Sequence, residues 1–284
     1  MKKLLLTQRS DTPHWVGDGF PVRSIFTYND LAKKISPFLL MDYAGPAEFS
    51  PTQKRRGVGE HPHRGFETVT IVYAGQVEHR DSAGGGGVIQ AGDVQWMTAA
   101  SGLVHEEMHG KDFSKTGGKF EMVQLWVNLP AKDKMNKPRY QGITSAQIPT
   151  ASLSKGSLRV IAGDFQGHKG AALTHTPINL WDIRLSAKSE NTFKVPVGHT
   201  TSVFVLSGKI KIGDSKWIES AELALLETEG EEFTIYAEED SNVLFLGGEP
   251  INEPIVGYGP FVMNTQAEIQ QAFHDFQEGK MGRI

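Results

Sequence analysis

The chain has 284 residues, of which 39% are hydrophobic and 22% are charged, and this composition is typical of folded globular domains. Its length suits two domains of ordinary size. The formal net charge of -4 lacks the basic excess of proteins that bind nucleic acids, so we expect no direct nucleic-acid binding.

Cysteine is absent, which excludes disulfides, iron-sulfur clusters and thiolate zinc sites. Any metal ion must therefore be held by histidine and carboxylate side chains. The apolar part of Met1 to Thr7 is too short for a secretory signal, and no later segment is apolar enough to span a bilayer. We therefore expect a cytoplasmic protein that does not interact with membranes.

The most informative segment is His61-Pro62-His63. Side chains alternate between the two faces of a β-strand, so two histidines separated by one residue point the same way. Pro62 also favours an extended backbone at His61. A second pair with the same spacing, His105 and Glu107, follows later in the chain. If the two pairs lie on facing strands, three imidazoles and a carboxylate form a compact site for a first-row metal ion.

Short β-branched runs and 31 glycines predict an all-β fold. Residues Glu67 to Tyr73 form one predicted strand, and Lys209 to Ile212 form another. Near the C-terminus, apolar residues at helical spacing predict one short helix over Gln266 to Gln277, which ends before Gly279.

An internal repeat divides the chain into two similar halves. Val69 to Val77 aligns with Ser202 to Ile210, and the four-glycine run Gly84 to Gly87 reads as an insertion in the first half. Self-similarity at long period indicates two copies of one β-unit. The boundary falls in the proline-rich stretch from Leu129 to Ser157.

We therefore predict an N-terminal metal-binding barrel over residues 1–135. The predicted second domain, residues 136–284, is a C-terminal barrel that lacks metal ligands and ends in the helix. In the second copy, the positions equivalent to His61, His63, His105 and Glu107 carry no set of metal-binding side chains. These positions are Lys194, Pro196, Thr234 and Tyr236.

The histidines also fit the two-part sequence pattern of cupins, which needs a β-barrel context to be meaningful. The fourth ligand has two candidates at this point. The general cupin pattern nominates Glu67, whereas the His-x-Glu spacing nominates Glu107. The alternative role for Glu67 is a strand residue or a partner of a ligand.

Four segments resemble the pirin family: Phe38 to Asp42, His61 to Val69, Gly92 to His105, and the motifs between Gly247 and Val262. The likeness covers nearly the whole chain. Pirins are bicupins, so the resemblance implies two tandem cupin barrels, each a double-stranded β-helix or jelly roll. It also implies a metal ion in the N-terminal barrel.

Carried over by residue, the resemblance implies that His61, His63, His105 and Glu107 hold this metal, and it selects Glu107 over Glu67. One transition-metal ion is implied, with iron(II) as the first choice. A purified sample can instead carry zinc, nickel, manganese, cobalt or copper.

Several pirins cleave the flavonol quercetin with O2. The resemblance therefore implies a metal-dependent oxidoreductase of the quercetin 2,3-dioxygenase type, or quercetinase, whose substrates are a small aromatic molecule such as a flavonol and O2. Glu107 would then be both a metal ligand and the catalytic general base that takes the proton of the flavonol 3-hydroxyl.

The alternative belongs to another class of function. Pirins in animals act on transcription factors, which implies a non-enzymatic, redox-sensing protein that regulates a protein partner through its metal state. A third possibility, a cupin sugar isomerase, lacks a lysine and acid pair that can be placed in the sequence.

Overall fold

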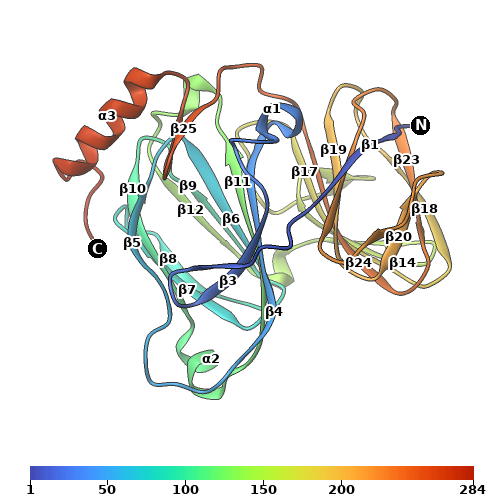
Figure 1. Ribbon diagram of the computed structural model, residues 1–284, viewed down its shortest axis with the longest axis horizontal. Helices are drawn as coiled ribbons and strands as arrows, with labels where there is room; N and C mark the ends of the chain where they lie inside the picture. Colours follow the sequence, from blue (N-terminus) through green and yellow to red (C-terminus); the bar gives the residue numbers. More distant parts are fainter. The chain divides into compact units, whose positions relative to one another are not determined.

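The computed structural model describes residues 1–284, and strands form most of it (Figure 1). The three α-helices are α1 (Ala32–Ile35), α2 (Lys111–Thr116) and α3 (Gln266–Gln277). The predicted all-β class is therefore confirmed. No helix has the length and apolar character that crossing a membrane would need.

The first barrel belongs to a compact unit made of Thr12–Lys33, Phe38–Ser145 and Ile251–Ile284. Its larger sheet has the strand order β12 (Arg139–Ile143), β9 (Val94–Thr98), β6 (Phe66–Ala74), β11 (Gly118–Asn128), β4 (Phe38–Phe49), β3 (Phe20–Phe26) and β2 (His14–Val16). Its smaller sheet has the order β5 (Gly57–His63), β10 (Leu103–His109), β7 (Gln76–Asp81) and β8 (Gly86–Gln90). The same unit contains α3 and the hairpin of β25 (Val256–Tyr258) and β26 (Phe261–Met263).

The second barrel belongs to a unit made of Met1–Asp11, Lys34–Pro37 and Ala146–Pro250. Its larger sheet has the order β1 (Leu4–Arg9), β22 (Glu222–Leu226), β19 (Thr200–Ser207), β24 (Ser241–Gly248), β17 (Ile178–Leu185), β14 (Gly156–Ala162) and β13 (Thr150–Leu153). Its smaller sheet has the order β18 (Ser189–Lys194), β23 (Glu232–Ala237), β20 (Lys209–Ile212) and β21 (Ile218–Glu219). A short hairpin joins β15 (Asp164–Phe165) and β16 (His168–Lys169).

The two barrels have the same strand order, position by position, in both of their sheets. Strand β6 corresponds to β19, and the pair β5 and β10 corresponds to β18 and β23. The two predicted strands are also present, since Glu67 to Tyr73 lies within β6 and Lys209–Ile212 is β20. The predicted architecture of two tandem cupin barrels is confirmed.

The compact units differ from the continuous domains 1–135 and 136–284. Strand β1 pairs with β22 of the second barrel, with Leu4 opposite Leu226, whereas β12 pairs with β9 of the first. Helix α3 also belongs to the unit of the first barrel rather than ending the second. Hydrophobic pattern does not reveal which sheet edge a strand joins. The division at residue 135 stays a prediction. In the compact units, the N-terminal segment Met1–Asp11 belongs with the second barrel and the C-terminal segment Ile251–Ile284 belongs with the first.

Helix α3 has the residue range that its periodicity predicts, Gln266–Gln277. It starts with a capping box, in which Thr265 accepts from the Glu268 backbone N–H and the Glu268 side chain accepts in return. A buried ion pair, 2.8 Å between Arg64 Nη1 and Asp275 Oδ2, attaches α3 to the barrel just after His63. The C-terminal helix is therefore anchored beside the first histidine pair.

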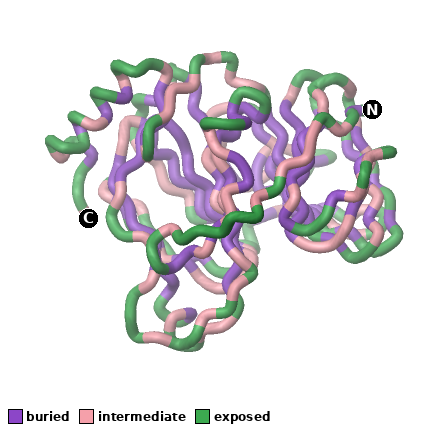
Figure 2. Tube along the Cα trace, viewed as in Figure 1, coloured by how far each residue is buried: buried purple, intermediate pink, exposed green.

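Aromatic rings fill the interior of the second barrel. Its strands carry many buried residues, which are coloured purple along the trace in Figure 2. Phe193 on β18 stacks on Phe233 on β23, with ring centroids 5.3 Å apart, and Phe233 stacks on Phe245 at 5.6 Å. Strands β18 and β23 correspond to the strands that carry the histidines in the first barrel. No cluster of three or more His, Asp or Glu side chains suited to a metal lies in this unit.

Lys134 is a buried lysine that ties the C-terminal hairpin to the first barrel. Its Nζ donates to Gly65 O at 2.7 Å, Asn128 Oδ1 at 2.7 Å and Val262 O at 3.0 Å. Burial lowers the pKa of Lys134 to about 7. Because the amine is the donor to three oxygens, its loss leaves buried acceptors unpaired.

We expect Lys134→Ala to lower the free energy of unfolding by about 3 kcal/mol, because buried acceptors without donors are costly. Urea denaturation measures this loss. Lys132 is exposed and close in sequence, so Lys132→Ala is the control and should change stability by less than about 0.5 kcal/mol. Equal losses in the two variants would contradict this role for Lys134.

Candidate metal centre

The two predicted ligand pairs lie on adjacent antiparallel strands. His61 and His63 are on β5, and His105 and Glu107 are on β10, with His105 directly opposite His61. A register shift between His105 and Glu107 interrupts this pairing, while β10 pairs regularly with β7 on its other side. The local alternation predicted from the sequence is therefore present, and the strand pairing brings the two segments together.

Three imidazoles form a tight cluster. Ring centroids are 4.2 Å apart for His61 and His105, and 4.9 Å apart for the pairs of His63 with each of the others. One nitrogen from each ring lies within 4.8 Å of the other two. His63 and His105 are buried, whereas His61 is half-buried. This arrangement can hold one metal ion on three nitrogens.

The remaining ring nitrogens are held by hydrogen bonds. His61 Nδ1 is 2.7 Å from Gly59 O, and His63 Nδ1 is 3.3 Å from Pro260 O. Histidines that bind metals commonly donate their other N–H to such carbonyl oxygens. His105 Nε2 is buried and has no hydrogen-bond partner. A buried polar atom rarely stays unpaired, so this nitrogen fits the position of a metal ligand.

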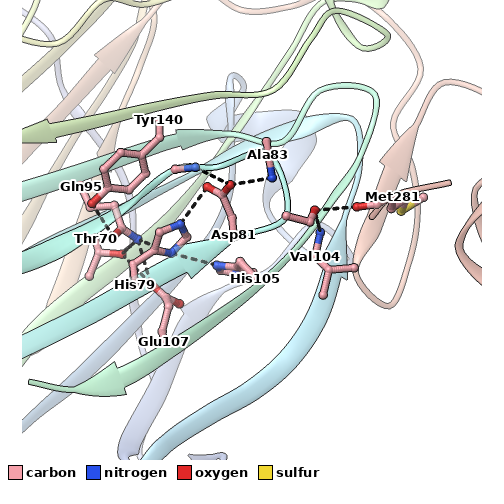
Figure 3. A network of polar contacts seen from close by, with 12 residues as sticks. Thr70, His79, Asp81, Ala83, Gln95, Val104, His105, Glu107, Tyr140 and Met281 are labelled. Carbon is pink, nitrogen blue, oxygen red and sulfur yellow. Dashed lines mark hydrogen bonds and ion pairs between the residues drawn. The ribbon is translucent and has the colours of Figure 1, made fainter. Parts of the chain in front are cut away.

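A series of hydrogen bonds from His105 through His79 to Asp81 determines which nitrogen of His105 is free (Figure 3). His105 Nδ1 is 3.3 Å from His79 Nδ1, and His79 Nε2 is 3.1 Å from Asp81 Oδ2. Asp81 also accepts from the backbone N–H groups of Ala83 and Gly85. Since a carboxylate only accepts, His79 donates through Nε2 and accepts at Nδ1. His105 then donates through Nδ1, which leaves a lone pair on its Nε2.

The electrostatics favour neutral imidazoles. Burial lowers the pKa of His63 and of His105 well below the usual value, and the nearby imidazole of His61 lowers both further. Neutral imidazole is the form that binds a metal ion. His63 and His105 can therefore bind a metal ion without first releasing a proton.

Glu107 is a buried carboxylate with one oxygen held and one free. Its Oε1 accepts from Gln95 Nε2 at 3.0 Å and lies 3.1 Å from Thr70 Oγ1, whose single hydrogen is shared with Gln124 Oε1 at 2.7 Å. The Gln95 amide is oriented by Tyr140, whose hydroxyl donates to Gln95 Oε1 at 3.3 Å. No hydrogen bond reaches Glu107 Oε2, so this oxygen is available to a metal ion or a proton.

The predicted residues fall into two overlapping clusters. His61, His63 and His105 form one, whereas Glu107 forms the other with His79 and His105. Their assignment as metal ligands stays a prediction. The sequence places His79 close to the site but leaves open whether it is a partner of a ligand or an exposed residue, and the structure shows it buried and 3.3 Å from His105 Nδ1.

Glu67, the other candidate for the fourth ligand, lies outside both clusters. It is buried in β6 and accepts a hydrogen bond from Thr98 Oγ1 at 2.6 Å. Burial raises its pKa to about 7. The environment of Glu67 is that of a structural residue between strands β6 and β9.

A cavity of about 350 Å³ adjoins the cluster and is lined by His61, His63 and Glu107. This volume falls within the range of sites for small organic molecules. Two further polar residues, Asp42 and Gln124, line it from the larger sheet. Its apolar wall includes Phe20, Val22, Met122 and Trp126. The cavity therefore suits a largely apolar ligand that reaches the histidines.

We expect His79→Ala to weaken metal affinity by about 10-fold to 100-fold, the usual cost of removing a group that orients a ligand. Competition with a metal chelator measures the affinity. The exposed His168 of the second barrel provides the control, and His168→Ala should bind the metal as the wild type does. Wild-type affinity in His79→Ala would refute the orienting role.

Two cupin barrels, one of them with a cluster of histidines and a glutamate at its cavity, define a bicupin with a candidate metal centre. The family model Pirin matches residues 19–127, and the model for the Pirin C-terminal cupin domain matches residues 180–282. The chain belongs to the pirin family.

Relatives agree with this assignment. The Pseudomonas aeruginosa protein named "Putative quercetin 2,3-dioxygenase PA2418" is 56% identical over 285 residues, covering 100% of this chain and 99% of that protein. The crystal structure of a quercetin 2,3-dioxygenase from Acinetobacter baumannii has a TM-score of 0.98 at 54% identity, covering 100% of this chain and 99% of that one. The bacterial pirin YhhW from Escherichia coli, solved in complex with nickel(II), has a TM-score of 0.66 at 20% identity, covering 87% and 99% of the two chains. This last likeness shows the fold alone.

Proposed function

We propose that this protein is a metal-dependent dioxygenase that cleaves quercetin-like flavonols with O2. In this proposal His61, His63, His105 and Glu107 hold one transition-metal ion, with iron(II) as the first choice. The observation that carries the proposal is the buried, unpaired Nε2 of His105 beside two imidazoles whose other nitrogens are already held. The names of the two relatives that are more than half identical support the substrate class.

Three imidazoles and one carboxylate fill four positions of an ion that accepts five or six, so positions remain for a substrate. The bound ion would supply Lewis acidity at the flavonol 3-hydroxyl and redox chemistry toward O2. In the overall reaction one flavonol and one O2 give a ring-opened ester and one carbon monoxide.

Glu107 is the general base in this proposal. Its Oε1 is fixed by Thr70 and Gln95, so the free Oε2 keeps a defined position on the cavity wall. An ionised carboxylate oxygen has two lone-pair sites, so Oε2 can face the ion with one and take the proton of the 3-hydroxyl with the other as the flavonol binds. The apolar wall, which includes Trp126 and Met122, contacts the flat rings and excludes water from the reacting edge.

The experiment is O2 uptake by iron-loaded protein, prepared anaerobically and mixed with quercetin. We expect quercetin-dependent O2 consumption with matching release of carbon monoxide. An inactive protein with a full complement of metal would contradict the enzymatic proposal. In that case, recovery of a protein partner with only one oxidation state of the metal would favour the regulatory alternative.

A further inference from the structure

A row of polar side chains crosses the larger sheet of the first barrel. In the strand register, Ser24 lies opposite Asp42, Asp42 opposite Gln124, Gln124 opposite Thr70, and Thr70 opposite Gln95. Residues directly opposite each other in antiparallel strands share one face of the sheet. The row therefore runs along one face over five strands, from β3 to β9.

The hydrogen bonds along the row are interrupted between Asp42 and Gln124. Ser24 Oγ donates to Asp42 Oδ1 at 2.5 Å. At the other end, Thr70 Oγ1 is 2.7 Å from Gln124 Oε1 and 3.1 Å from Glu107 Oε1. Asp42 Oδ2 and Gln124 Nε2 have no hydrogen-bond partner in the protein. One acceptor and one donor thus remain free side by side.

Both free groups belong to residues that line the cavity. His61 and His63 line the same cavity from the smaller sheet, so polar groups border it on both sheets. Burial raises the pKa of Asp42, although the hydrogen bond from Ser24 lowers it in part. Polar groups at an apolar cavity lose hydration, and a ligand that pairs with them restores the lost hydrogen bonds.

We infer that Asp42 and Gln124 form a second subsite of the cavity, which recognises a hydroxyl group on the part of a flat polyphenol remote from its metal-binding edge. A hydroxyl both donates and accepts, so it matches a carboxyl oxygen beside an amide N–H. This inference rests on the proposed function, and it makes Asp42 a residue that selects among flavonols by their peripheral hydroxyls. The sequence signal for this subsite is a single acidic residue, Asp42, at the end of the apolar run that begins at Phe38.

The test compares two probes that share the 3-hydroxyl and 4-carbonyl edge. Quercetin carries additional hydroxyls elsewhere on its rings, whereas the 3-hydroxyl is the single hydroxyl of 3-hydroxyflavone. Binding is measured by calorimetry on zinc-loaded protein under anaerobic conditions, so that no turnover occurs. Asp42→Leu should weaken quercetin binding about tenfold and change 3-hydroxyflavone binding by less than about twofold. Glu48→Leu is the matched control, since Glu48 is an exposed carboxylate on the same strand, away from this cavity.

Asp42→Asn keeps an oxygen for Ser24 and decides the question if the leucine variant does not fold. An amide N–H2 beside Gln124 Nε2 offers the hydroxyl two donors and no acceptor, so quercetin binding should again weaken selectively. Equal weakening of both probes, or no change in either, would overturn the subsite. A wild-type protein that binds neither probe would instead contradict the proposed flavonol function, and the subsite with it.

Discussion

Replacing Glu107 with glutamine should lower flavonol-dependent O2 uptake by about 100-fold to 10,000-fold, the range for the loss of a general base. The amide keeps an oxygen at the same reach but has too little basicity to take the proton of the 3-hydroxyl. Because three imidazoles remain, the variant should retain most of its metal. Steady-state O2 uptake and metal analysis on the same sample measure both quantities.

Glu106 provides a matched control for this experiment, because it is the neighbouring glutamate on the same strand. Its carboxylate accepts from Arg55 at 2.8 Å and from Arg80 at 2.6 Å, and it does not line the cavity. We expect Glu106→Gln to keep activity within about twofold of wild type, because its carboxylate binds the two arginines and does not reach the cavity. A fully active Glu107→Gln enzyme would refute the assignment of the base.

Replacing His105 with alanine should remove the metal itself. The change deletes the buried Nε2 at the centre of the cluster and also releases His79 from its contact with this ring. Two imidazoles and one carboxylate would then compete with water for the ion. We expect the wild type to contain one equivalent of metal per chain and His105→Ala to contain far less, as measured by elemental analysis after dialysis.

The second barrel supplies the controls for the loss of metal. Lys194 and Tyr236 occupy positions equivalent to ligands in the repeat, on β18 and β23. Lys194→Ala and Tyr236→Ala should leave both metal content and activity nearly unchanged. Two equivalents of metal in the wild type, or a full equivalent in His105→Ala, would contradict a single centre in the first barrel.

Much of the fold was predictable because its signals are local. The alternation at His61 and His63 requires only that the segment be a strand, and β5 is one. The range of α3 follows from apolar spacing and a capping box that both lie within a few residues. The repeat predicted a second barrel, and the packing of Phe193 on Phe233 fills part of its interior.

The features that the sequence left open or did not indicate depend on pairing between distant strands. His79 meets His105 only because β7 pairs with β10 in one particular register, which no local pattern specifies. Asp42 reaches the cavity because β4 pairs with β11 with Asp42 opposite Gln124. The assignment of β1 to the second barrel and of β12 to the first has the same origin. Each of these strands pairs with a strand that is distant in sequence, β1 with β22 and β12 with β9.

The most direct test of the central claim is a crystal structure of the metal-loaded protein, with the ion located by its anomalous scattering. We expect one ion per chain, with nitrogens of His61, His63 and His105 and an oxygen of Glu107 at about 2.0 to 2.3 Å from it. An ion bound by Glu67 while Glu107 points away, or an ion in the second barrel, would contradict the account.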